Sequence, residues 1–170
     1  MQDIVYSGFH TVKRLKTRIK GKDKIIESLG VKSAIGAIVI DSIGNICLVK
    51  QYRPCINETT YEIPAGLMDK EGKNPIQIIT EELYEECDIS KKEIEYIRPI
   101  CEYYMLCGSS DAKMQLYYVG LNTEKHSKKV SDNDVEEVIW FTMDEFKVLC
   151  MSGIIKDSKT MMCYYYLQTL

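Results

Sequence analysis

One stretch, residues 61 to 89, constrains the fold of this chain more than any other. It reads YEIPAGLMDKEGKNPIQIITEELYEECDI: an extended apolar segment, a turn with a glycine, and a segment rich in glutamate. Asn74 is a favourable N-cap, Pro75 suits the first helical position, and Gln77 can complete a capping box. The stretch therefore predicts a strand, a tight turn at residues 65 and 66, and a helix that begins at Pro75.

The predicted helix has an apolar stripe beside an acidic face. The stripe consists of Ile76, Ile79 and Leu83, which recur at helical spacing. The acidic face consists of Glu82, Glu85 and Glu86. Like charges one turn apart cost an isolated helix roughly 0.2–0.5 kcal/mol per pair, and a helix C-terminus disfavours anions. A solvated acidic face is the ordinary interpretation. Because an apolar strand and a glycine turn lead into this helix, we favour a site for a hard divalent cation such as Mg²⁺.

These residues resemble the Nudix box, in which a glycine precedes a glutamate-rich helix. Gly66 corresponds to the opening glycine, and residues 82 to 89 correspond to the Glu-apolar-any-Glu-Glu tail. Three positions depart from the family pattern. Glu81 stands where the family has arginine, Asp88 where it has glycine, and Lys73 where it has the first glutamate.

Flanking segments narrow the resemblance to the ADP-ribose pyrophosphatase branch. They are QYRP at 51–54, EIPAGLMD at 62–69 and CGSSDAKMQLYYV at 107–119. The resemblance implies an α/β fold, a Nudix-like α/β/α sandwich with a mixed β-sheet, over residues 34–170. It also implies that residues 1–33 form a small N-terminal antiparallel β-hairpin or sheet that serves for dimerisation.

The periodicity of the chain agrees with that fold. Residues 10 to 33 alternate and are basic, which predicts a hairpin whose charged side is either solvated or faces an anion. AIGAIVI and ICLVKQY, joined by DSIGN, predict central strands. Further strands are expected at 94–105, 113–121 and 136–141. Thr142 with Glu145, and Asp157 or Ser158, predict the starts of two later helices.

The resemblance implies roles for particular residues. Glu82 and Glu86 are the expected metal ligands, with Glu85 as a ligand or a group that positions water. The backbone carbonyl of Ala65 is a further expected ligand. Mg²⁺ is the expected cofactor, with Mn²⁺ as a substitute, since it is usually held by one or two carboxylates plus substrate phosphates.

A general base and a substrate-binding arginine complete the expected site. In the resembled branch an acidic residue in the late loop acts as base, which indicates Asp134 here, with Asp132 in reserve. Arg53 follows QY where the branch holds phosphate or ribose, and its planar fork suits phosphate. The alternatives are a solvated acidic loop and an ordinary surface arginine. Three consecutive residues can line the same pocket: Gly108, Ser109 and Ser110.

The three departures bear on turnover. The family arginine orients the glutamates by ion pairing, which Glu81 cannot do. We expect Lys73 to supply a compensating cation across the turn. Asp88 tolerates the left-handed conformation better than most residues, although less well than glycine.

Composition places the chain among ordinary globular proteins. Its 170 residues suit one domain with a small appendage, and a net charge of −3 leaves no footprint for nucleic acid. No apolar run is long enough to span a bilayer, and the N-terminus lacks the pattern of a signal peptide. Seven cysteines without a C-x-x-C pair, and two distant histidines, argue against zinc and favour a reducing cytoplasm.

Two functions from different classes are compatible with these features. The first is a Mg²⁺-dependent diphosphatase that hydrolyses ADP-ribose or a related nucleoside diphosphate sugar to two monophosphates. The second is a catalytically impaired Nudix-fold module that binds a nucleoside diphosphate ligand. The altered Glu81, Lys73 and Asp88 favour the second, and the retained Glu82, Glu85 and Glu86 favour the first.

Overall fold

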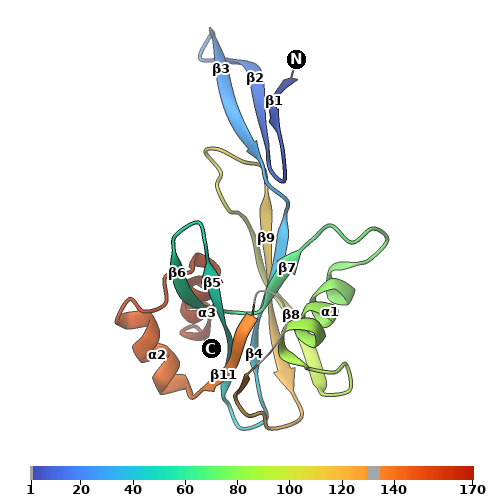
Figure 1. Cartoon of the computed structure of the whole chain (residues 1–170), viewed down its shortest axis with the longest axis vertical. Coiled ribbons are helices and arrows are strands. Elements are labelled where there is room, and N and C mark those ends of the chain that lie inside the picture. The colour runs from blue at the N-terminus through green and yellow to red at the C-terminus, as the bar shows by residue number, and fades with distance from the viewer. Residues whose placement is uncertain (1, 130–134) are drawn as a thin grey trace.

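A computed structural model describes residues 2–129 and 135–170, which form two β-sheets and the helices that cover the larger one (Figure 1). The smaller sheet is N-terminal and antiparallel, in the order β1 (Gln2–Ser7), β2 (Thr11–Ile19), β3 (Lys22–Gly30). The predicted hairpin is therefore confirmed as β2 and β3, and β1 adds a third strand. The turn between β2 and β3 passes through Lys20 and Gly21, both with positive φ.

The larger sheet is mixed. Its strands are β4 (Ala34–Ile40), β5 (Ile46–Arg53), β6 (Glu58–Glu62), β7 (Ala65–Leu67), β8 (Ile94–Tyr104), β9 (Lys113–Leu121), β10 (Lys128–Lys129) and β11 (Val135–Phe141). Six of them follow the order β10-β11-β5-β4-β9-β8, with β6 paired to β5 and β7 to β4. Strands β4 and β9 are parallel, and the other pairs are antiparallel.

The two central strands β4 and β5 separate soon after the loop that joins them. They pair only at Ile40 and Ile46. Further along, β6 extends the β5 side and β7 extends the β4 side, so residues 63 and 64 pass from one side to the other. Pro64, which cannot donate to a ladder, lies in this crossing, and its carbonyl accepts from the Ala37 N–H at 3.0 Å. The tight turn predicted at residues 65 and 66 is not observed, because the chain crosses at residues 63 and 64. Ala65 and Gly66 are instead the first two residues of β7, paired with Gly36 and Ile35 of β4.

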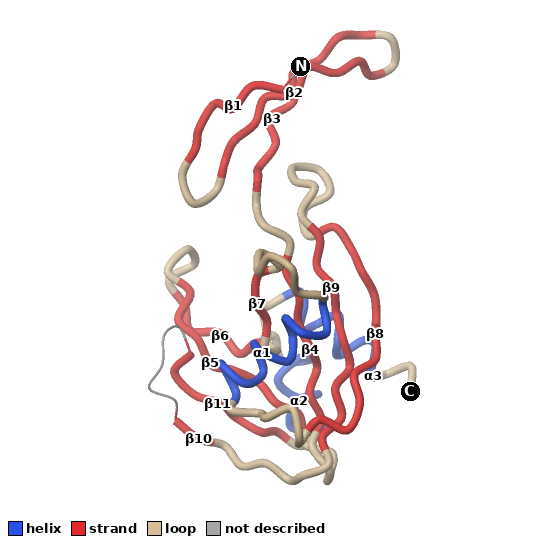
Figure 2. The backbone as a smooth tube through the Cα atoms, turned by 90° about the vertical axis from the view of Figure 1, so that its right-hand side faces the viewer, coloured by secondary structure: helices blue, strands red, loops and turns tan. Residues whose placement is uncertain are grey.

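Helix α1 (Pro75–Cys87) covers one face of this sheet, and α2 (Met143–Met151) and α3 (Ser158–Leu167) cover the other (Figures 1 and 2). Alternate residues of the central strands supply two separate cores. Ile35 and Val49 belong to the core beneath α1, whereas Ile38 and Leu48 belong to the core beneath α2 and α3. The expected α/β/α sandwich is therefore the observed fold.

The apolar stripe of α1 differs from the prediction at one position. Ile78, Ile79 and Leu83 are buried, but the Ile76 side chain is 51% exposed. Ile76 occupies the second position of the helix, where the first turn still points away from the sheet. Its place in the core is taken by Ile78.

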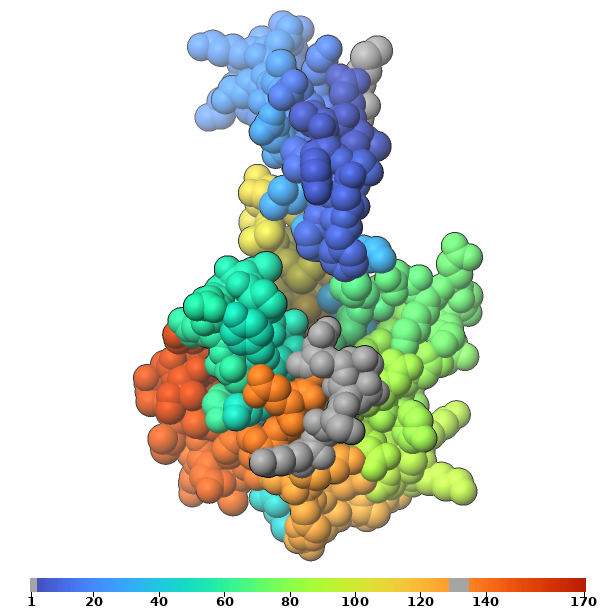
Figure 3. Space-filling view, viewed as in Figure 1, coloured from blue at the N-terminus to red at the C-terminus, as the bar shows by residue number. Residues whose placement is uncertain are grey.

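The N-terminal sheet projects from the rest of the molecule (Figure 3). Leu29 on β3 donates its N–H to the Ser109 carbonyl at 2.7 Å, and Lys32 pairs with Asp69 at 2.7 Å. Large apolar side chains on this sheet remain exposed by 40% or more: Ile4, Val5, Tyr6, Phe9, Ile25 and Leu29. In the described residues, no helix has the length and apolar character needed to cross a bilayer.

Candidate active site

The start of the acidic helix follows the predicted capping chemistry. The Asn74 side chain accepts from the Gln77 N–H at 3.0 Å, and the Gln77 side chain accepts from the Asn74 N–H at 2.9 Å. Pro75 occupies the first helical position, as expected. These contacts fix where α1 begins and so fix which side its glutamates present.

The helix ends at Asp88, where the family pattern has glycine. Asp88 adopts the left-handed conformation with φ 55° and ψ 39°, and its N–H bonds the carbonyls of Leu83 and Tyr84. Its side chain pairs with Lys128 at 2.7 Å, which lowers the pKa of Asp88. The expectation that Asp88 can replace the family glycine is therefore confirmed for the backbone.

Glu82 lies directly against Gly66 of β7. A Cβ added at Gly66 would fall 2.1 Å from the carboxyl carbon of Glu82, so only glycine leaves room for this carboxylate. Glu82 is 9% exposed. The opening glycine of the box and the first glutamate of its tail are therefore in contact, although sixteen positions of the sequence separate them.

Glu86 binds Ala65, the residue of β7 that precedes Gly66. Its carboxylate accepts from the Ala65 N–H at 3.2 Å. Burial raises the pKa of Glu86 to about 7, against the effect of this hydrogen bond, and the negative charge of Glu82 adds to the rise. Glu85, one residue before, has a side chain that is 60% exposed. Two carboxylates thus face residues 65 and 66 while the third points towards solvent.

Two lysines from the loop between β7 and α1 meet the acidic face. Lys73 pairs with Glu81 at 2.6 Å and lowers its pKa, which confirms that Lys73 supplies a compensating cation. Lys70 Nζ lies 3.0 Å from Glu82, 3.3 Å from Glu85 and 3.4 Å from Glu81. Burial opposes the charge on Lys70, but these carboxylates outweigh it and raise its pKa above the usual range.

A second charged cluster surrounds Glu62, at the end of β6. Arg53 donates to both carboxylate oxygens of Glu62, at 2.7 and 2.6 Å, and Thr60 donates at 2.5 Å. Lys159, from the first turn of α3, also pairs with Glu62 and reaches Asp157 at 3.0 Å. Burial opposes ionisation of Glu62, yet the hydrogen bond from Arg53 and the charge of Lys159 lower its pKa to about 2. Glu62 is therefore ionised and fixes the guanidinium of Arg53 in place.

A cavity of about 470 Å³ opens beside this cluster. It is lined by Arg53, Cys55, Ile56, Thr60, Glu62, Lys156, Asp157, Ser158 and Lys159. The positive charges of Lys159 and Arg53 are close enough to α1 to lower the pKa of Glu86. The cavity and the acidic helix therefore belong to one region, on either side of the crossing segment.

The structure brings together most of the predicted site. Arg53, Ala65 and the glutamates of α1 lie in this region, whereas Gly108, Ser109 and Ser110 do not line the cavity. These three residues lie in the β8–β9 loop, where the Ser109 carbonyl binds β3. Asp132 and Asp134, the expected general bases, lie outside the described residues.

Sequence reasoning did not assign Glu62, Lys70 or Lys159 a role. Glu62 is the first residue of the segment EIPAGLMD, which carries the family resemblance, so the sequence does contain a signal for this residue. Lys159 is 97 residues from Glu62. Only the packing of α3 beneath the crossing segment brings them together.

The donor set fits a divalent cation. Within residues 2–129 and 135–170, no three acidic, histidine or cysteine side chains already converge as a metal cluster. However, Glu82 and Glu86 are both held at residues 65 and 66, and hard carboxylate oxygens suit Mg²⁺. The ammonium of Lys70 lies among three glutamates, which shows that this face already attracts one cation.

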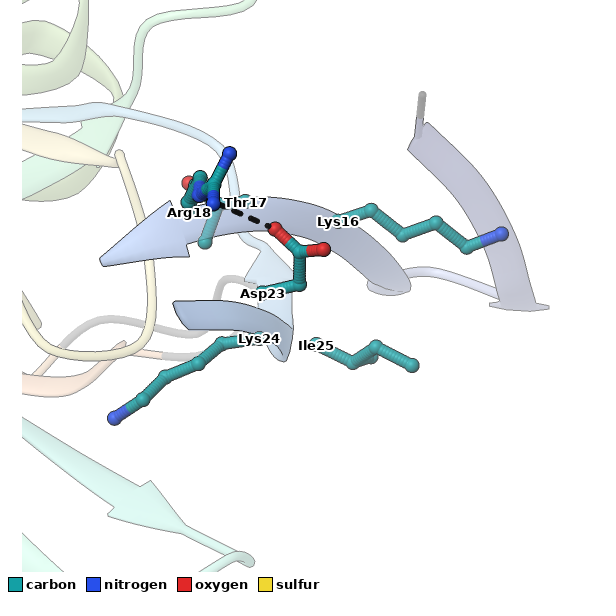
Figure 4. A pocket seen from close by; sticks show the side chains of 6 residues that line it. All are labelled: Lys16, Thr17, Arg18, Asp23, Lys24 and Ile25. Carbon is teal, nitrogen blue, oxygen red and sulfur yellow. Dashed lines mark ion pairs between the residues drawn. The ribbon is translucent and has the colours of Figure 1, made fainter. Parts of the chain in front are cut away.

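A larger hollow, of about 530 Å³, lies away from this region on the N-terminal sheet (Figure 4). It is lined by Lys16, Thr17, Arg18, Asp23, Lys24 and Ile25. Arg18 and Asp23 form an exposed ion pair of 3.7 Å across the β2–β3 turn. None of the residues that line this hollow belongs to α1 or to β7, so the hollow is separate from the acidic site.

Comparisons with known proteins place these features in a family context. A family model described as NUDIX domain matches residues 30–160. The methanol dehydrogenase activator of Bacillus methanolicus is 29% identical over 136 residues, which cover 79% of this chain and 71% of that protein. The ADP-ribose pyrophosphatase of Bacillus subtilis (strain 168) is 27% identical over 149 residues, covering 87% and 78%.

Two further similarities are narrower in what they show. The ADP-ribose pyrophosphatase of Mycobacterium tuberculosis is 36% identical over 63 residues, which cover 37% of this chain and 29% of that protein. A crystal structure described as an ADP compounds hydrolase superposes with a TM-score of 0.77 at 12% identity, covering 99% of this chain and 90% of that one. At this identity the superposition shows the fold alone.

Proposed function

The chain belongs to the Nudix hydrolase family, and from this premise we propose that it is a Mg²⁺-dependent diphosphatase acting on ADP-ribose or a related nucleoside diphosphate sugar. The products would be two monophosphates. Two relatives named ADP-ribose pyrophosphatase support this substrate class. The site described above supports the chemistry.

One observation carries the proposal: two carboxylates lie at the residues that follow the crossing segment, and an arginine suited to phosphate is held at the residue that precedes it. Glu82 packs on Gly66, and Glu86 accepts from the Ala65 N–H at 3.2 Å. Arg53 is held on the other side by Glu62. A diphosphate bound between them would meet a cation site at one end and a fixed guanidinium at the other.

The proposed metal ligands are Glu82 and Glu86, with Glu85 and the Ala65 carbonyl as further donors. A bound Mg²⁺ would polarise the phosphoryl oxygens and lower the pKa of a bound water. Glu85 is the most exposed of the three glutamates and is suited to orient that water. The general base that accepts its proton is proposed as Asp134, with Asp132 as the reserve.

Arg53 is the proposed substrate contact. Its guanidinium uses Nε and Nη2 for Glu62, and the side chain remains 44% exposed, so other N–H donors are available for phosphate. Gly108, Ser109 and Ser110 remain proposed substrate contacts in the β8–β9 loop. Their loop is bound to β3, because the Ser109 carbonyl accepts from the Leu29 N–H at 2.7 Å.

The N-terminal sheet supports a homodimer. Tyr6, Val12 and Leu29 occupy one register row and share a face, to which Ile25 also belongs. Tyr6 and Ile25 are 61% and 63% exposed. The same face also carries the ion pair of Arg14 and Glu27, which lies between Ile25 and Leu29, so the surface is mixed. Exposed apolar side chains of this size mark an interaction surface, and a second copy of the chain can cover them. The free thiols of the exposed Cys55 and Cys107 support a reducing, cytoplasmic setting.

A second candidate function is a binding module with little turnover. The observation that favours it is Lys70, whose ammonium already neutralises part of the acidic face. Such a module would hold a nucleoside diphosphate through Arg53 without cleaving it. One relative is named as an activator of another enzyme.

A coupled phosphate assay separates the two functions. Alkaline phosphatase releases inorganic phosphate from the two monophosphate products but leaves the diphosphate of intact ADP-ribose unaffected. We expect phosphate release with Mg²⁺. Because alkaline phosphatase itself needs metal ions, the reaction in excess EDTA is followed by chromatography of the monophosphates, and we expect none to form. Calorimetric binding of ADP-ribose without phosphate release would support the binding module, and full activity in EDTA would contradict the metal mechanism.

A further inference from the structure

Lys70 occupies the position that a metal ion would compete for. Its ammonium lies within 3.4 Å of carboxylates from three glutamates, Glu81, Glu82 and Glu85. Its side chain is only 26% exposed, compared with 39% for Lys73 and 46% for Lys32 nearby. Lys70 is therefore the most enclosed lysine of the loop between β7 and α1.

The contacts of Lys70 differ from those of Lys73 in one respect. Lys73 pairs with Glu81 alone, and Glu81 is not a proposed metal ligand. Lys70 pairs with Glu82 and Glu85, both of which are proposed ligands. The two lysines carry the same charge on the same short loop, so their effects on metal binding can be compared directly.

An ammonium and a divalent cation cannot share the same carboxylate oxygens. Both need those oxygens at close range, and two cations held this near to each other repel strongly. The carboxylate of Glu82 cannot retreat, because it is packed against Gly66. Lys70 is the mobile partner, since its long side chain comes from a loop rather than from a strand or helix.

We propose that Lys70 is a tethered counter-cation, which neutralises the acidic face when no metal is bound and leaves it when a divalent cation binds. The inference rests on the metal dependence of the proposed function. It assigns Lys70 a positioning role: the lysine gathers the carboxylates of Glu82 and Glu85 at one point. Lys70 also lowers the affinity of the site for a metal ion, because the ion must displace the ammonium.

Metal titration without substrate tests the proposal directly. The wild type, Lys70→Met, Lys70→Arg and Lys73→Met are titrated with Mn²⁺, and free Mn²⁺ is followed by electron paramagnetic resonance. We expect Lys70→Met to bind about tenfold more tightly than the wild type, and Lys73→Met to change by less than about threefold. Lys70→Arg keeps the charge and should stay close to the wild type. Thermal melts confirm that each variant is folded.

Amine labelling gives a readout that is independent of affinity. Reductive methylation followed by mass spectrometry reports how accessible each lysine is. In the wild type, saturating Mg²⁺ should increase the labelling rate of Lys70 by about threefold, while Lys32 and Lys73 stay unchanged. A merely structural ion pair would keep Lys70 protected with and without the metal.

The outcomes distinguish this proposal from the proposed function. Equal or weaker Mn²⁺ binding by Lys70→Met, or unchanged labelling of Lys70, would overturn the counter-cation role and leave the diphosphatase proposal standing. Absence of Mn²⁺ binding by both the wild type and Lys70→Met would overturn the role of Lys70, because no metal would then compete with it before substrate binds. The metal dependence of the diphosphatase is decided separately, by product formation from ADP-ribose with Mg²⁺ and in EDTA.

Discussion

At the scale of single residues, the site depends on how closely side chains approach residues 65 and 66, at the start of β7. Gly66 gives the plainest case, because the Glu82 carboxylate fills the space that any side chain would need. The sequence pattern indicated a glycine and a glutamate that belong together. It could not show that they touch, since that depends on how α1 packs on the sheet.

Gly66→Ala should reduce the activity while the protein still folds. The new Cβ would fall 2.1 Å from the Glu82 carboxyl carbon, so the carboxylate must move. We expect kcat/KM for ADP-ribose to fall by about 10–100-fold, the range found when groups that support a metal ligand are disturbed. Gly108→Ala is the control for thermal stability alone, because a Cβ there meets no atom within 4 Å but Gly108 is itself a proposed substrate contact. Unchanged kinetics in Gly66→Ala would contradict the role of Glu82.

Glu86→Gln should lower kcat by roughly tenfold or more, since it keeps the shape of the side chain but removes the charge that a hard cation needs. The amide oxygen of glutamine can still accept from the Ala65 N–H, so the start of β7 should keep its structure. Steady-state kinetics at low Mg²⁺ measure the effect. If kcat were unchanged there, the acidic face would be only a solvated surface.

The same substitution should stabilise the metal-free protein at high pH. Burial raises the pKa of Glu86 from 4.5 to about 7. Between these values the folded state binds more protons than the unfolded state, so the free energy of unfolding falls as the pH rises. Glu86→Gln removes this cost, which is at most about 3 kcal/mol and is fully present above pH 7. Denaturant unfolding in EDTA at pH 4 and pH 8 should show a gain only at pH 8.

At the scale of elements, the local signals predicted most of the secondary structure. The capping boxes at Asn74 and Thr142, and the cap at Asp157, all appear in the structure because each depends on residues within one turn. The exposure of Ile76 was not predicted, since periodicity does not say which residues of a first turn reach the core. Local signals also could not predict contacts between elements far apart in the sequence, such as the hydrogen bond between Thr160 of α3 and Ile63 of the crossing segment.

Thr160→Val tests that link. Thr160 is fully buried, and its hydroxyl accepts from the Ile63 N–H at 2.9 Å and donates to Asp157 at 2.6 Å. Valine has the same shape but leaves the buried N–H without a partner, which should cost about 1–3 kcal/mol. For a chain of this size each kcal/mol lowers Tm by about 2–4 °C. Calorimetry should show this decrease.

The matched control for this link is Thr169→Val. Thr169 is exposed after the end of α3, and its hydroxyl bonds only the Tyr166 carbonyl. A change at such a surface position usually stays within about 0.5 kcal/mol. Equal melting temperatures for Thr160→Val and the wild type would show that α3 does not hold the crossing segment.

At the scale of the whole molecule, the two sheets differ in how they are covered. The larger sheet lies between α1 on one face and α2 and α3 on the other, and each face has its own apolar core. No helix within residues 2–129 and 135–170 covers the N-terminal sheet, whose apolar side chains stay exposed (Figure 3). Within the described residues, the larger sheet is therefore covered on both faces, whereas the N-terminal sheet is not.

If a second copy covers this face, a charge placed on it should separate the dimer. Ile25→Lys places an ammonium opposite Lys16, on the face that carries Tyr6 and Leu29, where desolvation and the repulsion between the two lysines would oppose association. The matched control is Val148→Lys on α2, because Val148 and Ile25 have the same exposed fraction, 63%. Light scattering at micromolar concentration should give twice the 19.6 kDa chain mass for the wild type and Val148→Lys, and the chain mass for Ile25→Lys. Deletion of residues 1–33 should likewise give monomer or aggregate. A monomeric wild type would refute the dimer, and a dimeric Ile25→Lys would place the interface elsewhere.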